Sequence, residues 1–266
     1  WCAGQKTDPW DHIESAMGLS TGGYLREARL AFEWSARMQL EDGCWYSTYM
    51  RGAPEDTTRD ANLSSYIAVG VFHYYLITAD VDFIERMWPT VSAAIDFALH
   101  LQTHEGEIHW AISPEGQVDP MALLTGSSSI YMSLKCALAI AKILGQPAGR
   151  WQTGLIQLGN AIKHKPHLFN MTKSRFSMDW FYPVLCGAVT GDAAGRRIKR
   201  RWKKYVVEGL GVRCVSDQPW VTIACRFSDS DAMPRSIGYL DDLTVLTTIM
   251  NALQKEIKEY RVWKEK

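Results

Sequence analysis

Three carboxylates are the residues of this sequence best suited to acid–base chemistry. Asp11 and Glu14 are three positions apart, so on a helix both lie on one side, just before the apolar stretch 16–19. Asp179 stands beside Trp180 at the beginning of another apolar segment. Paired carboxylates protonate a leaving group and activate water, and an acid in an aromatic cavity protonates an alkene. A simpler interpretation, with Asp11 as a helix cap and Glu14 in solvent, has equal standing.

Aromatic and polar residues stand near these acids, where apolar segments begin. Aromatic faces stack on sugar rings and shield cations, and a few polar groups fix the orientation of a ligand. Taken singly, a residue of these types at such a place is more often a helix cap or a packing residue. The evidence for a site is that all of them stand where apolar segments begin. The predicted substrate-binding residues are Trp10, Trp45, Tyr46, Asp60, Asn62, Trp110, Trp180, Arg213, Asp217 and Trp220.

Other reactive residue types give weaker patterns. His100 and His104 share a helix face and His109 follows, but no acidic or cysteine ligand completes a metal site. The basic run 196–204 is typical of a solvated helix face, although it also suits phosphates or anionic lipid. Ser127–Ser129 lack a nucleophile elbow, and no glycine loop for phosphate is present. We therefore expect no metal and no cofactor.

Composition indicates a folded, charge-balanced chain. Its 266 residues are 47% hydrophobic, which is enough for a sizeable core. The 29 basic and 29 acidic residues give no overall attraction to nucleic acid. There is no run of about eighteen apolar residues, so no membrane-spanning helix is predicted. Six cysteines without a C-x-x-C pair favour a reducing, cytoplasmic compartment.

Helical periodicity recurs throughout the chain and predicts an all-α fold. Segments that are apolar nearly all round alternate with amphipathic ones at intervals of roughly 35 to 50 residues, as in repeated inner–outer hairpins of an (α/α) toroid. Every loop that enters an inner helix then lies at the same end of the ring. The predicted helices span 24–38, 63–76, 83–101, 127–144, 151–163, 178–189 and 194–207.

The hairpins are expected to begin near Asp11, Asn62, Ser127 and Met178. A fifth begins at 218–224, whereas a closed toroid of this kind needs about six. We therefore predict an incomplete toroid domain of about four and a half hairpins over residues 1–224. Residues 225–266 are predicted to form an atypical tail with one amphipathic helix. Uncovered helices would favour self-association.

One stretch resembles a known hairpin. Residues 59–97, with R-D-A-N at 59–62 and M-W-P-T at 87–90, resemble the inner–outer hairpin of six-hairpin glycosidases, which include glucoamylase-type and debranching enzymes. The likeness is weaker at 106–110 and 177–183. It implies an (α/α) barrel and a carbohydrate substrate.

Two further resemblances concern other segments. Gln39 to Trp45 is similar to the Q-x-x-D-G-x-W repeat of squalene–hopene-type cyclases and toroidal prenyltransferases, with a looser echo from Gln102 to Trp110. In those families the motif ties helix ends together. The cyclases' D-x-D-D run is absent, and residues 10–224 resemble bacterial prenyltransferase-like proteins. Residues 237–246 resemble the G-Y-L-D-D-L core of a small bacterial helical domain of unknown function.

Three functions follow from these patterns. The leading hypothesis is a glycoside hydrolase-like protein that acts on or binds an oligosaccharide, with Asp11, Glu14 and Asp179 in one cavity beside the tryptophans at 10, 45, 110 and 180. The first alternative is an isoprenoid-processing toroid, in which aromatic rings stabilise a cation. The second is a non-catalytic binding or scaffold remnant.

Overall fold

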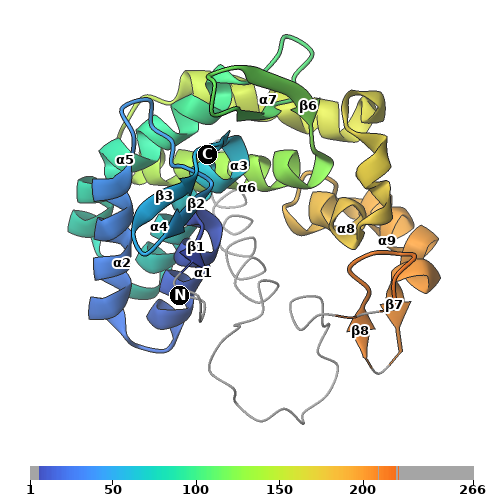
Figure 1. Ribbon diagram of the computed structural model, residues 1–266, viewed down its shortest axis with the longest axis horizontal. Helices are drawn as coiled ribbons and strands as arrows, with labels where there is room; N and C mark the ends of the chain where they lie inside the picture. Colours follow the sequence, from blue (N-terminus) through green and yellow to red (C-terminus); the bar gives the residue numbers. More distant parts are fainter. Residues whose placement is uncertain (1–5, 209, 220, 222–266) are drawn as a thin grey trace, which may run out of the picture. The chain divides into compact units, whose positions relative to one another are not determined.

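The computed structural model describes residues 6–208, 210–219 and 221 (Figure 1). The chain divides into two compact units after Phe169, and each is described by itself below. The predicted domain boundary at 224, the tail at 225–266 and the segment resembling the small helical domain all lie outside the described residues. They stay predictions.

The first unit is built from helical hairpins in two layers, as predicted. The inner helices α1, α4 and α6 contact one another in turn, and the outer helix α5 contacts both α2 and α7 (Figure 1). The inner layer comprises α1 (Pro9–Thr21), α3 (Ala61–Ser65) with α4 (Ile67–Thr78), and α6 (Leu124–Ile143). The outer layer comprises α2 (Leu25–Met38), α5 (Val81–His100) and α7 (Gly149–His164).

Hydrophobicity explains which helix lies in which layer. Every residue from Ile67 to Tyr74 of α4 is buried, because the other helices of the unit surround this helix. Outer helix α2 buries Ala28, Phe32 and Ser35 and exposes most of its charged residues to water. The predicted starts of the first three hairpins are therefore confirmed to within about three residues.

Short strands, which the sequence analysis did not predict, precede the inner helices of the first unit: β1 lies before α1, and the others occupy the loops that run from an outer helix to the next inner helix. One antiparallel sheet joins β1 (Lys6–Thr7), β2 (Thr48–Met50) and β3 (Ala53–Asp56), and the other joins β4 (Arg59–Asp60), β5 (His109–Ile112) and β6 (Val118–Ala122). In the registers, Thr7 lies opposite Tyr49 and Asp60 lies opposite Ala111. The strands thus hold the residues just before α1 and α3 in place.

The Q-x-x-D-G-x-W segment ties helix ends together, as the resemblance implied. Gln39 follows α2, and its side-chain Nε2 donates to Gly43 O at 2.8 Å and to Thr90 O, on α5, at 2.9 Å. Gly43 has a φ of +90°, and a Cβ there would lie 2.3 Å from the carbonyl oxygen of Ala93. Only glycine fits this turn against the next outer helix.

The segment from Gln102 to Trp110, which resembles this motif more loosely, has the same geometry at the next hairpin. Gln102 Nε2 donates to Gly106 O and to Gly154 O, on α7, both at 3.0 Å. Gly106 has a φ of +106°, and its Cβ would lie 2.6 Å from the carbonyl oxygen of Gln157. We call these two segments the glutamine turns. They join outer helices laterally.

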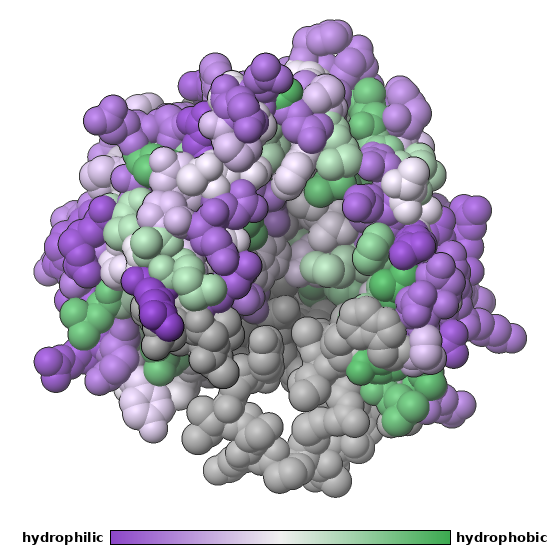
Figure 2. Space-filling view, viewed as in Figure 1, coloured by the Kyte–Doolittle hydropathy of each residue, from purple (hydrophilic) through white to green (hydrophobic). Residues whose placement is uncertain are grey.

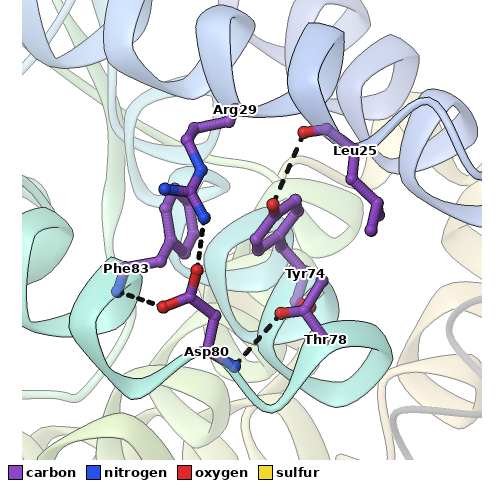
Figure 3. A network of polar contacts seen from close by, with 6 residues as sticks. All are labelled: Leu25, Arg29, Tyr74, Thr78, Asp80 and Phe83. Atoms are coloured by element: carbon purple, nitrogen blue, oxygen red, sulfur yellow. Dashed lines mark hydrogen bonds and ion pairs between the residues drawn. The ribbon is translucent and has the colours of Figure 1, made fainter.

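A polar network closes the opposite end of the α4–α5 hairpin (Figure 3). Asp80 caps α5 by accepting from the backbone N–H of Phe83 at 2.9 Å, and it forms an ion pair with Arg29 of α2. The hydroxyl of Tyr74 donates to the carbonyl oxygen of Leu25 at 3.4 Å. These contacts join inner and outer helices to one another.

The second unit contains one helical hairpin among its described residues. It is formed by α8 (Ser177–Leu185) and α9 (Gly191–Tyr205), which contact each other, after the turn η2 (Met171–Arg175). Helix α8 ends before the predicted 189, because Gly187 turns the chain with a φ of +71°. Helix α9 ends at Tyr205, because β7 (Val206–Val207) pairs with β8 (Gly211–Val212).

Hydrophilic residues cover most of the face seen in Figure 2, with apolar residues scattered between them. In the described part of the chain, no helix combines the length and the apolar character needed to cross a bilayer.

Candidate functional site

Two aspartates begin adjacent inner helices of the first unit. Asp8 is the N-cap of α1 and accepts from the backbone N–H of Asp11 at 2.8 Å. Asp60 is the N-cap of α3, and its Oδ1 accepts from the N–H groups of Asn62 at 2.7 Å and Leu63 at 2.9 Å. Since α1 and α3 contact each other, both carboxyl groups lie at one end of the inner layer.

Burial raises the pKa of both carboxyl groups. The pKa of Asp60 rises to about 6 because burial disfavours its charge more than its two N–H bonds favour it, and the nearby charge of Asp8 raises it further. Burial likewise raises the pKa of Asp8, with a smaller contribution from the charge of Asp11. A buried carboxyl group whose pKa is raised, partly by the charge of a second carboxylate, is suited to general acid–base chemistry.

Glu14 lies further along α1 and is held by two aromatic residues. Its Oε1 accepts from the indole Nε1 of Trp10 at 2.7 Å and from the hydroxyl of Tyr66 at 2.8 Å. The rings of Trp10 and Tyr66 stack with centroids 4.1 Å apart and 6° between their planes. The carboxylate therefore has a fixed position beside a flat aromatic surface. Trp10, which forms part of this surface, is only partly buried.

Asp11 and Glu14 both lie on α1, as predicted, but their surroundings differ. Asp11 is exposed in the first turn, where a carboxylate suits the helix dipole. The cap of α1 is Asp8, so the alternative in which Asp11 caps the helix is wrong. Of the two acids, Glu14 is the one enclosed by other side chains.

The remaining predicted residues of the first unit divide into two groups. Asn62 and Trp110 are partly buried near Asp60, because β4 and β5 pair Asp60 with Ala111, next to Trp110. Tyr46 is also partly buried. Trp45, in contrast, is 3% exposed, and its indole donates to the carbonyl oxygen of Ser35 at 2.8 Å. Trp45 has the placement of a core residue.

Asp179 and Trp180 of the second unit both lie in its interior. Asp179 is 6% exposed near the start of α8. Trp180 is 1% exposed, stacks on Tyr205 at 5.1 Å, and donates its indole N–H to Arg197 O at 3.0 Å. These contacts give Trp180 a packing role in α8.

The last predicted residues lie after α9. Arg213 is partly buried, and its backbone N–H donates to Tyr205 O at 2.8 Å. Asp217 is exposed and forms an ion pair with Arg175 at 3.4 Å. Trp220 lies outside the described residues. A single cavity shared by Asp11, Glu14 and Asp179 remains a prediction, because these residues belong to different units.

Sequence reasoning did not select Asp8 or Tyr66 as site residues. The Asp8-Pro9 pair is an ordinary helix-start signal in the sequence, and the raised pKa that Asp8 shares with Asp60 follows from burial, which that signal does not report. Tyr66 precedes an apolar helix, and its bond to Glu14 joins residues 52 positions apart. Among the described residues, no three histidine, cysteine or acidic side chains group as metal ligands would.

One curated protein is similar over most of the chain. Over 222 residues the chain is 50% identical to "MMP endo-(1,4)-3-O-methyl-alpha-D-mannosidase" of Mycolicibacterium hassiacum. The match covers 84% of this chain and 61% of that relative, so the chain spans less than two thirds of its length. No protein-family model matches the chain.

Solved structures show the same fold at low sequence identity. A rhamnosidase from Klebsiella oxytoca with rhamnose bound has a TM-score of 0.58 at 15% identity, covering 74% of this chain and 42% of that chain. The GH63 mannosylglycerate hydrolase of Thermus thermophilus, in complex with glucose, has a TM-score of 0.59 at 11% identity, covering 82% and 74%. The predicted (α/α) toroid of the six-hairpin glycosidase type is therefore confirmed.

Proposed function

We propose that this chain, which has the (α/α) toroid fold of the six-hairpin glycosidase type, is a glycoside hydrolase-like protein. Its proposed substrate is an α-mannoside-containing oligosaccharide. The observation that carries the proposal is the group of carboxylates and aromatic rings where α1 and α3 begin, in a chain half identical to an endo-mannosidase. The isoprenoid alternative is not favoured, because the relative and the neighbours described above act on or bind sugars.

The carboxyl groups of this site have distinct proposed roles. Glycoside hydrolysis needs one acid that protonates the leaving oxygen and one carboxylate that acts as base or nucleophile. Asp60, whose pKa is about 6, keeps a proton in mildly acidic solution and is the proposed acid. Asp8 is its proposed partner, since the charges of the two groups interact.

Glu14 and its aromatic neighbours are proposed to bind the sugar. The bonds from Trp10 and Tyr66 hold Glu14 in one position, so its carboxylate can accept from sugar hydroxyls without reorganising. The partly buried Trp10 offers a ring on which a pyranose can stack. We also propose that Asp11 contributes to the sugar-binding site, whereas the catalytic role predicted for Asp179, in the second unit, stays a prediction.

The test is hydrolysis of mannose-containing and 3-O-methylmannose-containing oligosaccharides, followed by the release of reducing ends. Asp8→Asn and Asp60→Asn are each expected to lower kcat about a hundredfold or more, as loss of an acid–base group does. Asp82→Asn is the matched control, since Asp82 is an exposed acid in the first turn of outer helix α5. Unchanged kcat in both site variants would refute the assigned roles, and sugar binding without any hydrolysis would refute the catalytic proposal.

A further inference from the structure

The second unit contains a cavity that the proposed function does not use. Its volume is about 390 Å³, and it lies along α9, with Trp180 of α8 as one wall. This volume is within the range of about 300 to 1,000 Å³ that small-molecule sites occupy. The lining residues are Trp180, Ala193, Arg196, Arg197, Arg200 and Arg201.

The lining of this cavity carries a concentrated positive charge. Four of the six described residues that line it are arginines, although the chain as a whole has 29 basic and 29 acidic residues. Helix α9 adds Lys199, Lys203 and Lys204, against one acid, Asp192. In the described part of the chain, no basic side chain of α9 forms an ion pair with a carboxylate. The surface over α9 is hydrophilic in Figure 2.

Two of the arginines are held in place by neutral groups. Arg197 donates from Nε to Trp180 O at 2.8 Å and from Nη2 to Asp179 O at 2.6 Å, and Arg201 donates from Nη1 to Ser174 O at 3.3 Å. Carbonyl oxygens orient a guanidinium without neutralising it. Burial and the charge of Arg201 lower the pKa of Arg197, and the nearby carboxylate of Asp179 opposes this shift.

The other two arginines are exposed and four positions apart. Arg196 and Arg200 therefore lie one turn apart on the side of α9 that lines the cavity. A guanidinium presents several N–H donors in a planar fork that matches the oxygens of a phosphate group. Small Ala193 at the same face leaves room for such a group.

We propose that this cavity binds the phosphate groups of a small phosphorylated molecule. Arg197 and Arg201 form the fixed base of the site, and Arg196 and Arg200 close on the phosphate oxygens from the solvent side. The cavity volume exceeds that of one phosphate, so a ligand with two linked phosphates or with a phosphate on a sugar fits the space. The inference does not depend on the proposed hydrolase activity.

Isothermal titration calorimetry of the full chain with pyrophosphate, at constant ionic strength, tests this site. The double variant Arg196→Gln/Arg200→Gln is compared with Lys199→Gln/Lys203→Gln, which removes the same charge from exposed positions of α9 outside the cavity lining. Each lost charged hydrogen bond is expected to weaken binding about tenfold, so the arginine variant loses about a hundredfold. The lysine variant is expected to lose less than about threefold, because distant charges are screened.

Three results would overturn the proposal. One is the absence of pyrophosphate binding by the unmodified chain, and another is equal weakening in the two double variants, which indicates diffuse attraction without a site. The third is binding to vesicles of phosphatidylglycerol without binding of pyrophosphate, which indicates a lipid surface as the source of phosphate. Circular dichroism checks that both variants are folded.

Discussion

Replacing Asp60 by asparagine is expected to make the protein more stable while removing its activity. Asparagine is as good an N-cap as aspartate, so its side-chain oxygen can still accept from the N–H groups of Asn62 and Leu63. The substitution removes only the charge, which burial makes unfavourable. Stability and catalysis therefore place opposite demands on Asp60.

The size of the effect follows from the pKa of Asp60. Burial raises this pKa from 3.8 to about 6, and each pKa unit corresponds to about 1.36 kcal/mol, so the ionised group costs the folded state at most about 3 kcal/mol at pH 8. Because Asp60 is only partly buried, we expect Asp60→Asn to raise the free energy of unfolding by about 1 to 2 kcal/mol.

The pH dependence has a defined sign. Between pH 3.8 and about 6, the folded protein holds more of the Asp60 proton than the unfolded chain does, so this group lowers stability as pH rises through that window. Above it the cost is constant. The gain from Asp60→Asn is thus expected in full at pH 8 and to be less than about 1 kcal/mol at pH 4.

Urea unfolding of the unmodified protein and of Asp60→Asn at pH 4 and pH 8 measures the difference in their free energies of unfolding. Groups that titrate equally in the two proteins cancel from this difference. Asp80→Asn is the control, because Asp80 is also an N-cap but forms an ion pair with Arg29, so its loss is expected to destabilise by about 1 kcal/mol. A loss of stability in Asp60→Asn at pH 8, or a gain that is the same at both pH values, would refute the reasoning.

Three further outcomes are expected. Burial lowers the pKa of His73 to about 4, so this histidine alone should cost the folded state about 2 kcal/mol as pH falls from 6.5 to 4, and in urea unfolding His73→Phe should be more stable relative to the unmodified protein at pH 4 than at pH 6.5. Gly43→Ala should lower the thermal midpoint strongly, at a cost of about 2 to 4 kcal/mol, whereas Gly52→Ala, with similar φ but open space, should cost about 1 kcal/mol. Trp10→Ala should raise KM for the oligosaccharide at least about tenfold, and unchanged KM would exclude the stacking role.

The helices and their pairing were predictable because periodicity reports burial directly. The segment 63–76 is apolar all round and is the inner helix α4, and the hairpin starts lie close to their predicted positions. The strands were not predictable, since β1 and β4 have two residues each and depend on partners 42 or more positions away. Such short segments carry no periodic signal.

The candidate site was only partly predictable, for a different reason. A tryptophan at the start of an inner helix has the same sequence signature whether it meets a ligand or the core. What distinguishes Trp10 from Trp45 and Trp180 is where their indole N–H groups are directed: toward the Glu14 carboxylate, or toward the backbone carbonyls of Ser35 and Arg197. These partners follow from tertiary packing.

The two glutamine turns link neighbouring outer helices in the same way, because in each a glutamine that follows one outer helix bonds a backbone carbonyl of the next. The glutamines are 63 positions apart (102 minus 39) and their acceptors on the next outer helices 64 (154 minus 90). The side chain of each glutamine thus has both of its acceptors only when the following hairpin supplies the second carbonyl oxygen. Insertion or removal of a whole hairpin repeat would keep each glutamine beside a backbone carbonyl of the following outer helix, whereas adding or removing one residue within outer helix α5 or α7 would rotate that carbonyl away from the glutamine. The repeat, rather than the single helix, is the unit in which such a ring can be lengthened or shortened.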